Sequence, residues 1–156
     1  MKAVVVVASN RAAAGVYEDA TGPLIVEALT EAGFAVEAPV VVPDGEAVGD
    51  AIRSAVEGGA RAVLTTGGTG LTPTDLTPEA TRPLLDREVP GVAEAIRAYG
   101  VAQGVPTAAL SRGLAGVSGT AFVVNLPGSR GGVKDGLAVV VPLLLHAVEQ
   151  VTGSDH

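Results

Sequence analysis

The sequence contains no cysteine and no tryptophan, and it is poor in aromatic and basic residues. The absence of cysteine excludes disulfide bridges and thiolate–metal sites. Only two tyrosines and two phenylalanines are present, and ten scattered lysines and arginines stand against seventeen acidic residues. A nucleic-acid surface normally shows a basic stripe, which the net charge of −7 argues against, and the few aromatic rings leave little for base stacking. We therefore expect no nucleic-acid partner.

Long hydrophobic runs are also missing. No window holds the roughly 18 to 20 uninterrupted apolar residues of a membrane span. The first eleven residues contain a short apolar run that leads into a polar loop without a cleavage site, which favours a buried strand over a signal peptide. Apolar residues make up 47% of the 156 residues and charged residues 17%, which suits one folded domain over 1–156. We expect a cytoplasmic protein without a membrane partner.

Apolar runs typical of buried strands alternate along the chain with stretches of helical periodicity. The expected strands cover 3–8, 35–42, 62–66 and 121–125. The expected helices cover 23–32, 45–57, 78–85, 92–103 and 142–151, with a weaker helical stretch at 131–140. Pro142 is expected to begin the last helix. This order predicts an α/β fold, a three-layer sandwich in which helices cover both faces of a mostly parallel sheet.

The segment Thr65–Glu79, TTGGTGLTPTDLTPE, is the most informative part of the chain. Glycines at this density let the backbone approach a ligand closely, and successive amides in such a turn form an anion-binding concavity. The Thr-Pro-Glu sequence at 77–79 is typical of a helix start. A phosphate cradle, the carboxylate of Asp75 and a helix N-terminus are therefore expected within one loop. The alternative is a merely flexible loop, which the acid and the helix start make less attractive.

This loop differs from two better-known phosphate-binding motifs. A P-loop requires a Gly-Lys pair, and none occurs in the chain. A dinucleotide fingerprint requires GxGxxG, but the stretch Gly68–Pro73 has proline where the third glycine belongs. Both classes are therefore disfavoured.

The TTGGTG sequence and the DLTPEAT that follows resemble the signature of the molybdenum-cofactor biosynthesis proteins of the MogA/MoaB type. Similar stretches occur in the same order along nearly the whole chain, at Ser9–Gly22, Val42–Asp44, Leu110–Arg112 and Asn125–Ser129. Proteins of this family bind molybdopterin, and many adenylylate it. The resemblance implies a molybdopterin-binding-domain-like fold and a nucleotidyltransferase that uses ATP as co-substrate, molybdopterin as substrate and Mg²⁺ as cofactor.

The resemblance also implies roles for individual residues. Asp44 and Asp75 each follow a predicted strand and would converge on one Mg²⁺ as the catalytic, metal-holding acids. Read from the residues alone, Asp44 equally suits a cap of the next helix and Asp75 an Asx turn. The implied contacts to nucleotide and pterin are Thr65, Thr66, Gly67, Gly68, Thr69, Gly70, Ser111, Arg112, Leu126, Pro127, Gly128 and Ser129.

Several other polar residues keep two interpretations. Asp19 belongs either to the site or to the start of the helix behind it, and Arg130 and Lys134 belong either to the site or to a solvated surface. Asn10 stands where many relatives have an acid. His146 lies in an apolar stretch typical of a core or an interface, and His156 ends the chain. With no cysteine and only two histidines, a His/Cys zinc site is argued against.

Three functions remain open at this level. The leading one is an Mg²⁺-dependent molybdopterin adenylyltransferase. The second is a molybdopterin-binding protein with little or no turnover, and the third acts on another nucleotide-linked metabolite. Retention of both acids favours the enzyme, because binding alone requires no metal-holding pair. Mean hydropathy of +0.42 indicates apolar surface left for a partner subunit, and the resemblance implies a homotrimer or a hexamer.

Overall fold

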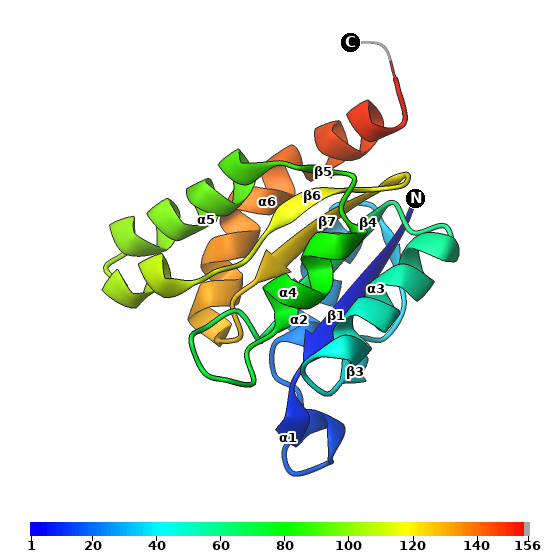
Figure 1. Ribbon diagram of the computed structural model, residues 1–156. Helices are drawn as coiled ribbons and strands as arrows, with labels where there is room; N and C mark the ends of the chain where they lie inside the picture. The colour runs from blue at the N-terminus through cyan, green and yellow to red at the C-terminus, as the bar shows by residue number, and fades with distance from the viewer. Residues whose placement is uncertain (155–156) are drawn as a thin grey trace.

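A seven-stranded sheet forms the centre of the computed structural model, which describes residues 1–154 (Figure 1). The strand order is β2-β1-β4-β7-β6-β5. β3 also pairs with β1, at Val6–Ala8, whereas β2 pairs with the start of β1 at Lys2–Ala3. The strands are β1 (Lys2–Ala8), β2 (Ala35–Val36), β3 (Val40–Val42), β4 (Ala62–Thr66), β5 (Arg87–Glu88), β6 (Ala115–Ser118) and β7 (Ala121–Leu126).

Three parallel strands in the middle of the sheet determine where its functional edge lies. β1 pairs with β4 so that Val7 faces Thr66, and β4 pairs with β7 so that Thr66 faces Leu126. Every residue of β4 and β7 is buried, because helices cover both faces. Since parallel strands end at the same edge, the loops that follow β1, β4 and β7 meet there.

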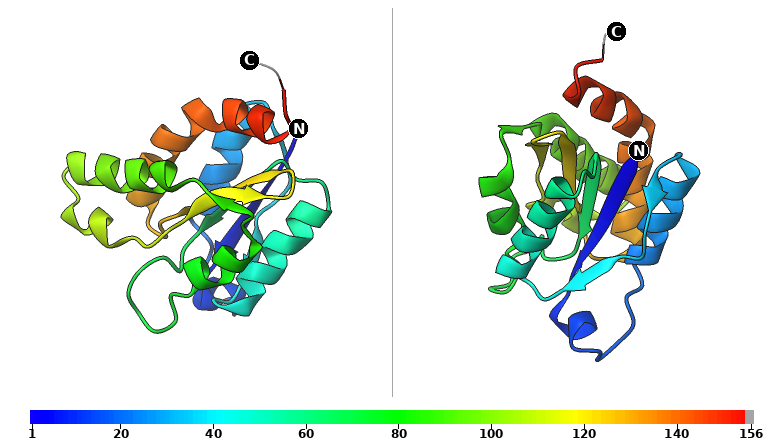
Figure 2. Two further views of the ribbon diagram at one scale, coloured as in Figure 1. Left: turned by 45° about the horizontal axis from the view of Figure 1, so that its top comes forward. Right: turned by 90° about the vertical axis from the view of Figure 1, so that its right-hand side faces the viewer.

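Helices pack on both faces of the sheet, as the expected three-layer architecture requires (Figure 2). One core joins the sheet to three helices, α2 (Gly22–Glu31), α5 (Pro90–Ala102) and α6 (Arg130–Val151). The other joins it to α3 (Glu46–Glu57) and α4 (Thr77–Thr81). Short helical turns complete the chain, namely α1 (Asn10–Ala13), η1 (Arg82–Leu84) and η2 (Pro106–Leu110).

The sheet departs from the expectation at both sides. The expected strand at 35–42 is divided into β2 and β3, because Pro39 has no amide for the ladder. On the other side, β7 with β6 and β6 with β5 pair antiparallel, whereas the other four of the six strand pairings are parallel, so the sheet is mostly parallel as expected. β6 reads Ala-Gly-Val-Ser and β5 has only two residues, and such short sequences carry no strand periodicity.

α6 is one helix of 22 residues, although a helix was expected to begin at Pro142. Pro142 lies inside it on the exposed side, where water can satisfy the carbonyl left without a partner. The buried side, which includes Leu137, Val140 and Leu144, is packed in the core and holds both halves together. Within residues 1–154, this helix is long and apolar enough to cross a membrane by length and composition, a test that core helices also pass.

Candidate functional site

Two glycine turns pack against each other at the carboxyl edge of the central strands. The Gly67 amide, just after β4, donates to the carbonyl of Leu126 at the end of β7 (3.2 Å). A Cβ on Gly128 would lie 3.1 Å from the Cα of Gly67, so the two backbones are in direct contact. The glycines of the TTGGTG and LPGS sequences therefore build one continuous surface.

The first two glycines of TTGGTG are required by both conformation and packing. Gly67 and Gly68 have φ values of 91° and 67°, in the left-handed region. A Cβ on Gly67 would lie 2.3 Å from the carbonyl oxygen of Ala8, and one on Gly68 would lie 2.3 Å from the Thr77 hydroxyl. Neither position has room for a side chain.

The loop uses its carbonyls internally and leaves its amides free. The Gly67 carbonyl accepts from the Thr77 hydroxyl (2.9 Å), and the carbonyls of Gly68 and Thr69 accept from the amides of Thr77 (3.0 Å) and Arg112 (2.9 Å). The amides of Gly68, Thr69 and Gly70 donate to no acceptor within residues 1–154. Consecutive amides without partners provide the donor set of an anion cradle.

Asp44 lies directly over this loop. Its amide donates to the side chain of Asn10 (2.9 Å), which fixes the backbone after β3. α3 begins at Glu46, its N-cap residue is Gly45, and no side chain caps it. Asp44 is therefore not the helix cap that the sequence allowed as an alternative. Its Oδ1 is buried without a hydrogen-bond partner in the described chain, and a Cβ on Gly68 would lie 2.9 Å from it. Buried polar atoms rarely lack a partner, so this oxygen is suited to a bound cation.

Asp75 lies at the other end of the same loop. Its Oδ2 accepts from the Thr72 amide (3.0 Å), three residues earlier, and so stabilises the turn without forming the Asx turn that the sequence allowed as an alternative, in which the donor lies two residues further on. A Cβ on Gly70 would lie 2.8 Å from this oxygen. Asp75 therefore shapes the turn and, through its second oxygen, still presents a carboxylate beside the free amides.

The two acids act on each other. The pKa of Asp44 is raised above its usual value, mainly because burial disfavours the charged form and also because the charge of Asp75 is near. Within residues 1–154 no group of three or more metal-binding side chains occurs. A pair of carboxylates suits Mg²⁺, which keeps several waters and takes its other ligands from substrate phosphates.

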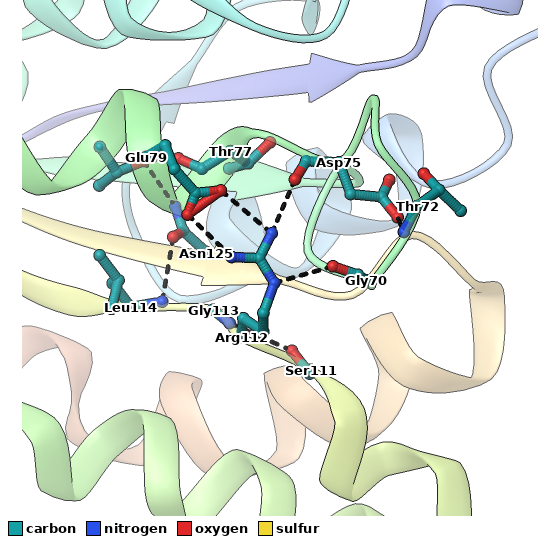
Figure 3. Close-up of polar contacts among 11 residues, drawn as sticks. Gly70, Thr72, Asp75, Thr77, Glu79, Ser111, Arg112, Gly113, Leu114 and Asn125 are labelled. Atoms are coloured by element: carbon teal, nitrogen blue, oxygen red, sulfur yellow. Dashed lines mark hydrogen bonds and ion pairs between the residues drawn. The ribbon is translucent and has the colours of Figure 1, made fainter.

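Arg112 holds the loop in place from the side (Figure 3). Its guanidinium donates to the carbonyls of Gly70 (2.9 Å) and Asp75 (2.7 Å) and to both carboxylate oxygens of Glu79 (2.8 and 3.0 Å). The hydrogen bonds from Arg112 lower the pKa of Glu79 below its usual range. Four of the five guanidinium N–H groups of Arg112 are bonded to the protein, which gives it a positioning role, and its expected substrate contact stays a prediction.

The hydroxyls of Thr65 and Thr66 are likewise committed. Both side chains are fully buried at the end of β4. Thr65 accepts from the side-chain amide of Asn125 (2.9 Å), and Thr66 donates to the carbonyl of Pro127 (2.7 Å). The side chain of Leu126 is also buried in the core. These three residues therefore position the two turns, in place of the ligand contacts expected from the sequence.

A cavity of about 420 Å³ opens on the free-amide side of the loop. Among the residues expected to bind ligand, those that line it are Gly68, Thr69, Gly70, Asp75, Ser111, Pro127, Gly128 and Ser129. Ser129 caps α6 by accepting from the Gly132 amide (3.0 Å), so the positive end of this helix dipole faces the cavity.

The far wall of this cavity was not anticipated. It comes from α5, η2 and the second turn of α6, and it includes Ile96, Arg97, Val105, Leu110 and Asp135. The helical periodicity of α5 marks Ile96 as a core residue, and nothing in the sequence links α5 to the glycine loop, because only the crossing of α5 and α6 brings them together. The one available signal was that Asp135 follows Gly131 by four residues and so shares its helix face.

A smaller hollow of about 210 Å³ lies on the other side of the Gly67–Gly128 contact and includes Tyr17, Asp19 and Arg130. Asp19 accepts from the amides of Thr21 and Gly22 (both 3.0 Å) and so caps the start of α2. Arg130 lines this hollow, whereas Lys134 is exposed on α6.

His146 lies away from the cavity. His146 lines a separate apolar hollow between α6 and β6. His156 lies outside the residues that the structure describes.

Comparison with known proteins gives consistent matches over this chain. Residues 4–146 match the family described as a probable molybdopterin binding domain. A molybdenum cofactor biosynthesis bifunctional protein of Synechococcus elongatus is 41% identical over 99% of the chain and 48% of its own length. A molybdopterin adenylyltransferase of Helicobacter pylori is 35% identical over 94% of the chain and 85% of its own length.

Solved structures agree with these sequence matches. The molybdopterin biosynthesis Mog protein from Mycobacterium ulcerans is 50% identical, covers 96% of this chain and 98% of its own, and superposes with a TM-score of 0.91. The chain spans about half the length of the bifunctional proteins that it matches.

Proposed function

The chain belongs to the MogA/MoaB-type family of molybdopterin-binding domains, and from this premise we propose that it is a nucleotidyltransferase that adenylylates molybdopterin with ATP. The observation that carries the proposal is a row of free amides, Gly68 to Gly70, between two carboxylates, Asp44 and Asp75. Backbone donors therefore lie between acids from two segments of the chain, which suits phosphate groups that arrive with a cation.

The reaction joins two polyanions. A phosphate oxygen of molybdopterin forms a bond to the α-phosphorus of ATP, the bond from that phosphorus to the bridging oxygen breaks, and pyrophosphate leaves with the electron pair. Such a transfer requires positioning and charge neutralisation more than covalent help from the protein. The free amides and the α6 N-terminus supply fixed donors for phosphate oxygens.

Asp44 and Asp75 are the residues that would hold Mg²⁺. The unpaired, buried Oδ1 of Asp44 and the second oxygen of Asp75 supply the hard oxygen ligands that this ion prefers. When bound, Mg²⁺ would neutralise part of the negative charge of the phosphates. We assign the cavity of 420 Å³ to molybdopterin because it combines donors at one end with apolar walls at the other.

The experiment incubates the purified chain with ATP, Mg²⁺ and molybdopterin and detects adenylylated molybdopterin by mass spectrometry. Asp75→Asn should lower turnover at least about a hundredfold, a loss of roughly 3 kcal/mol of transition-state stabilisation. Asp50→Asn, which changes an exposed acid on α3, serves as the control and should leave turnover unchanged.

Two outcomes would contradict the proposal. Molybdopterin binding without product in the wild type would favour the alternative, a binding protein with little or no turnover. If Asp75→Asn instead melts many degrees lower while its folded fraction stays fully active, Asp75 is a turn former alone.

We further propose a trimer-based homo-oligomer, supported by exposed apolar residues such as Val40, Leu110 and Leu145.

A further inference from the structure

The cavity of 420 Å³ has two chemically different ends. Hydrogen-bond donors gather at one end, on the glycine loop and the first turn of α6. Asp135, one turn further along α6 than Gly131, also lines the cavity, together with apolar side chains such as Ile96 and Leu110. A ligand that fills this cavity therefore meets donors at one end and an acceptor at the other.

Asp135 has no partner within the protein. Its side chain is half-buried, and it makes no hydrogen bond or ion pair within residues 1–154. Arg97 lines the same cavity, but its guanidinium donates to the carbonyls of Ser111 (3.3 Å) and Gly113 (3.2 Å). The helix dipole stabilises acids in the first turn of a helix, and Asp135 lies beyond the first turn of α6. Neither the helix dipole nor an ion pair therefore accounts for an acid at this position.

The spacing along α6 relates the two ends of the cavity. Asp135 follows Gly131 by four residues, so both lie on the helix face that borders the cavity. At 1.5 Å per residue, Asp135 lies about 6 Å further along the helix than Gly131. This separation fits a fused bicyclic ring with a phosphate at one end and a hydrogen-bonding edge at the other.

We propose that Asp135 is the residue that selects the pterin ring, by accepting two hydrogen bonds from the ring amide N–H and the adjacent exocyclic amino group. This inference rests on the assignment of the cavity to molybdopterin. A carboxylate accepts two parallel hydrogen bonds from such a donor pair, as it does from a guanidinium. Adenine presents a donor beside an acceptor on its equivalent edge, so the same carboxylate disfavours the base of ATP at this position.

The test measures molybdopterin binding to the full chain by fluorescence titration without ATP. Asp135→Asn keeps the shape of the side chain but turns one acceptor into a donor. Glu149→Gln is the matched control, because it removes one negative charge from the same helix about 21 Å further along. We expect the Kd of Asp135→Asn to rise about tenfold to a hundredfold, which corresponds to about 1.4–2.8 kcal/mol. The control should bind as the wild type does.

Two further measurements sharpen the result. Asp135→Glu keeps the acceptor pair and should recover part of the affinity, whereas a merely structural role predicts no such rescue. Thermal melts of all variants separate lost binding from lost folding. A folded Asp135→Asn protein with wild-type affinity overturns the inference, and so does a wild type that binds no molybdopterin.

The outcomes also separate this inference from the proposed reaction. Wild-type binding without adenylylation would refute the reaction and leave the role of Asp135 in place. Guanine carries the same donor pair, so GMP is titrated in parallel. Tighter binding of GMP than of molybdopterin, with the same loss in Asp135→Asn, would assign the carboxylate to guanine and overturn its role in pterin selection.

Discussion

Replacing Gly67 by alanine tests whether the glycine loop is held by backbone packing. Two costs apply to this change. An alanine with φ near 91° loses roughly 1–2 kcal/mol in the left-handed region. Its Cβ would also lie 2.3 Å from the Ala8 carbonyl oxygen, which must shift, and overpacking of this kind adds roughly 1–3 kcal/mol.

Gly59→Ala provides a matched control for the first cost. Gly59 has a φ of 89°, nearly that of Gly67, but a Cβ there would have nothing within 4 Å. The control should therefore show the conformational cost alone, about 2–8 °C in Tm at the 2–4 °C per kcal/mol of a domain of this size. The Tm of Gly67→Ala should fall further, by the additional cost of the contact between its Cβ and the Ala8 carbonyl oxygen.

Turnover separates the two variants more sharply than stability does. The free amides of Gly68 to Gly70 follow Gly67 directly, so a shift of its backbone moves the phosphate cradle. Misplacement of this kind lowers the rate by up to about a hundredfold. Calorimetry and the adenylylation assay measure both properties on the same samples. Equal Tm losses in the two variants, or full turnover in Gly67→Ala, would refute the reasoning.

The pairing of Arg112 with Glu79 and the environment of Asp44 lead to three further predictions. Arg112→Lys should lower the free energy of unfolding by about 1–2 kcal/mol, because one ammonium cannot reach both loop carbonyls and the carboxylate. The pKa of Glu79 is lowered, so the stability from this pair is complete above about pH 4.3 and is lost as pH falls through the lower folded-state value. Between pH 7 and pH 2 the Tm of Glu79→Gln should therefore fall less steeply with decreasing pH than the Tm of the wild type. Identical curves of Tm against pH would contradict this. The pKa of Asp44 is raised, so its ionisation opposes folding as pH rises. Asp44→Asn should raise Tm at pH 7 and abolish its increase on addition of Mg²⁺, and a lower Tm without Mg²⁺ would contradict the assignment.

The fold could be predicted wherever the pattern was local and long enough. The buried strands at 62–66 and 121–125 and the amphipathic helix at 45–57 were identified within one or two residues, because apolar periodicity marks them directly. The antiparallel strand β6 could not be identified, since its four residues have no pattern and depend on pairing with β7. Pro142 was misread as a helix start because its exposed position in α6 depends on which side of that helix is buried.

The site shows the same division. Glycines, carboxylates and their order along the chain predict an anion site in the loop from Gly67 to Asp75, because glycine permits backbone conformations that other residues avoid and proline restricts them locally. The partners of individual side chains could not be predicted. Arg112 and Thr66 were expected to face a ligand, yet both bond to protein carbonyls that other segments bring near them.

The sequence by itself determined the α/β class, the central strands and the composition of the glycine loop to which we assign the phosphate groups. Tertiary structure alone decided which polar atoms remained free. Thr65 is enclosed because Asn125 approaches it from the neighbouring strand, and Asp135 enters the cavity because α6 crosses α5. Local propensity acts through a few neighbouring residues, whereas burial and hydrogen-bond partners depend on contacts between segments far apart in the chain.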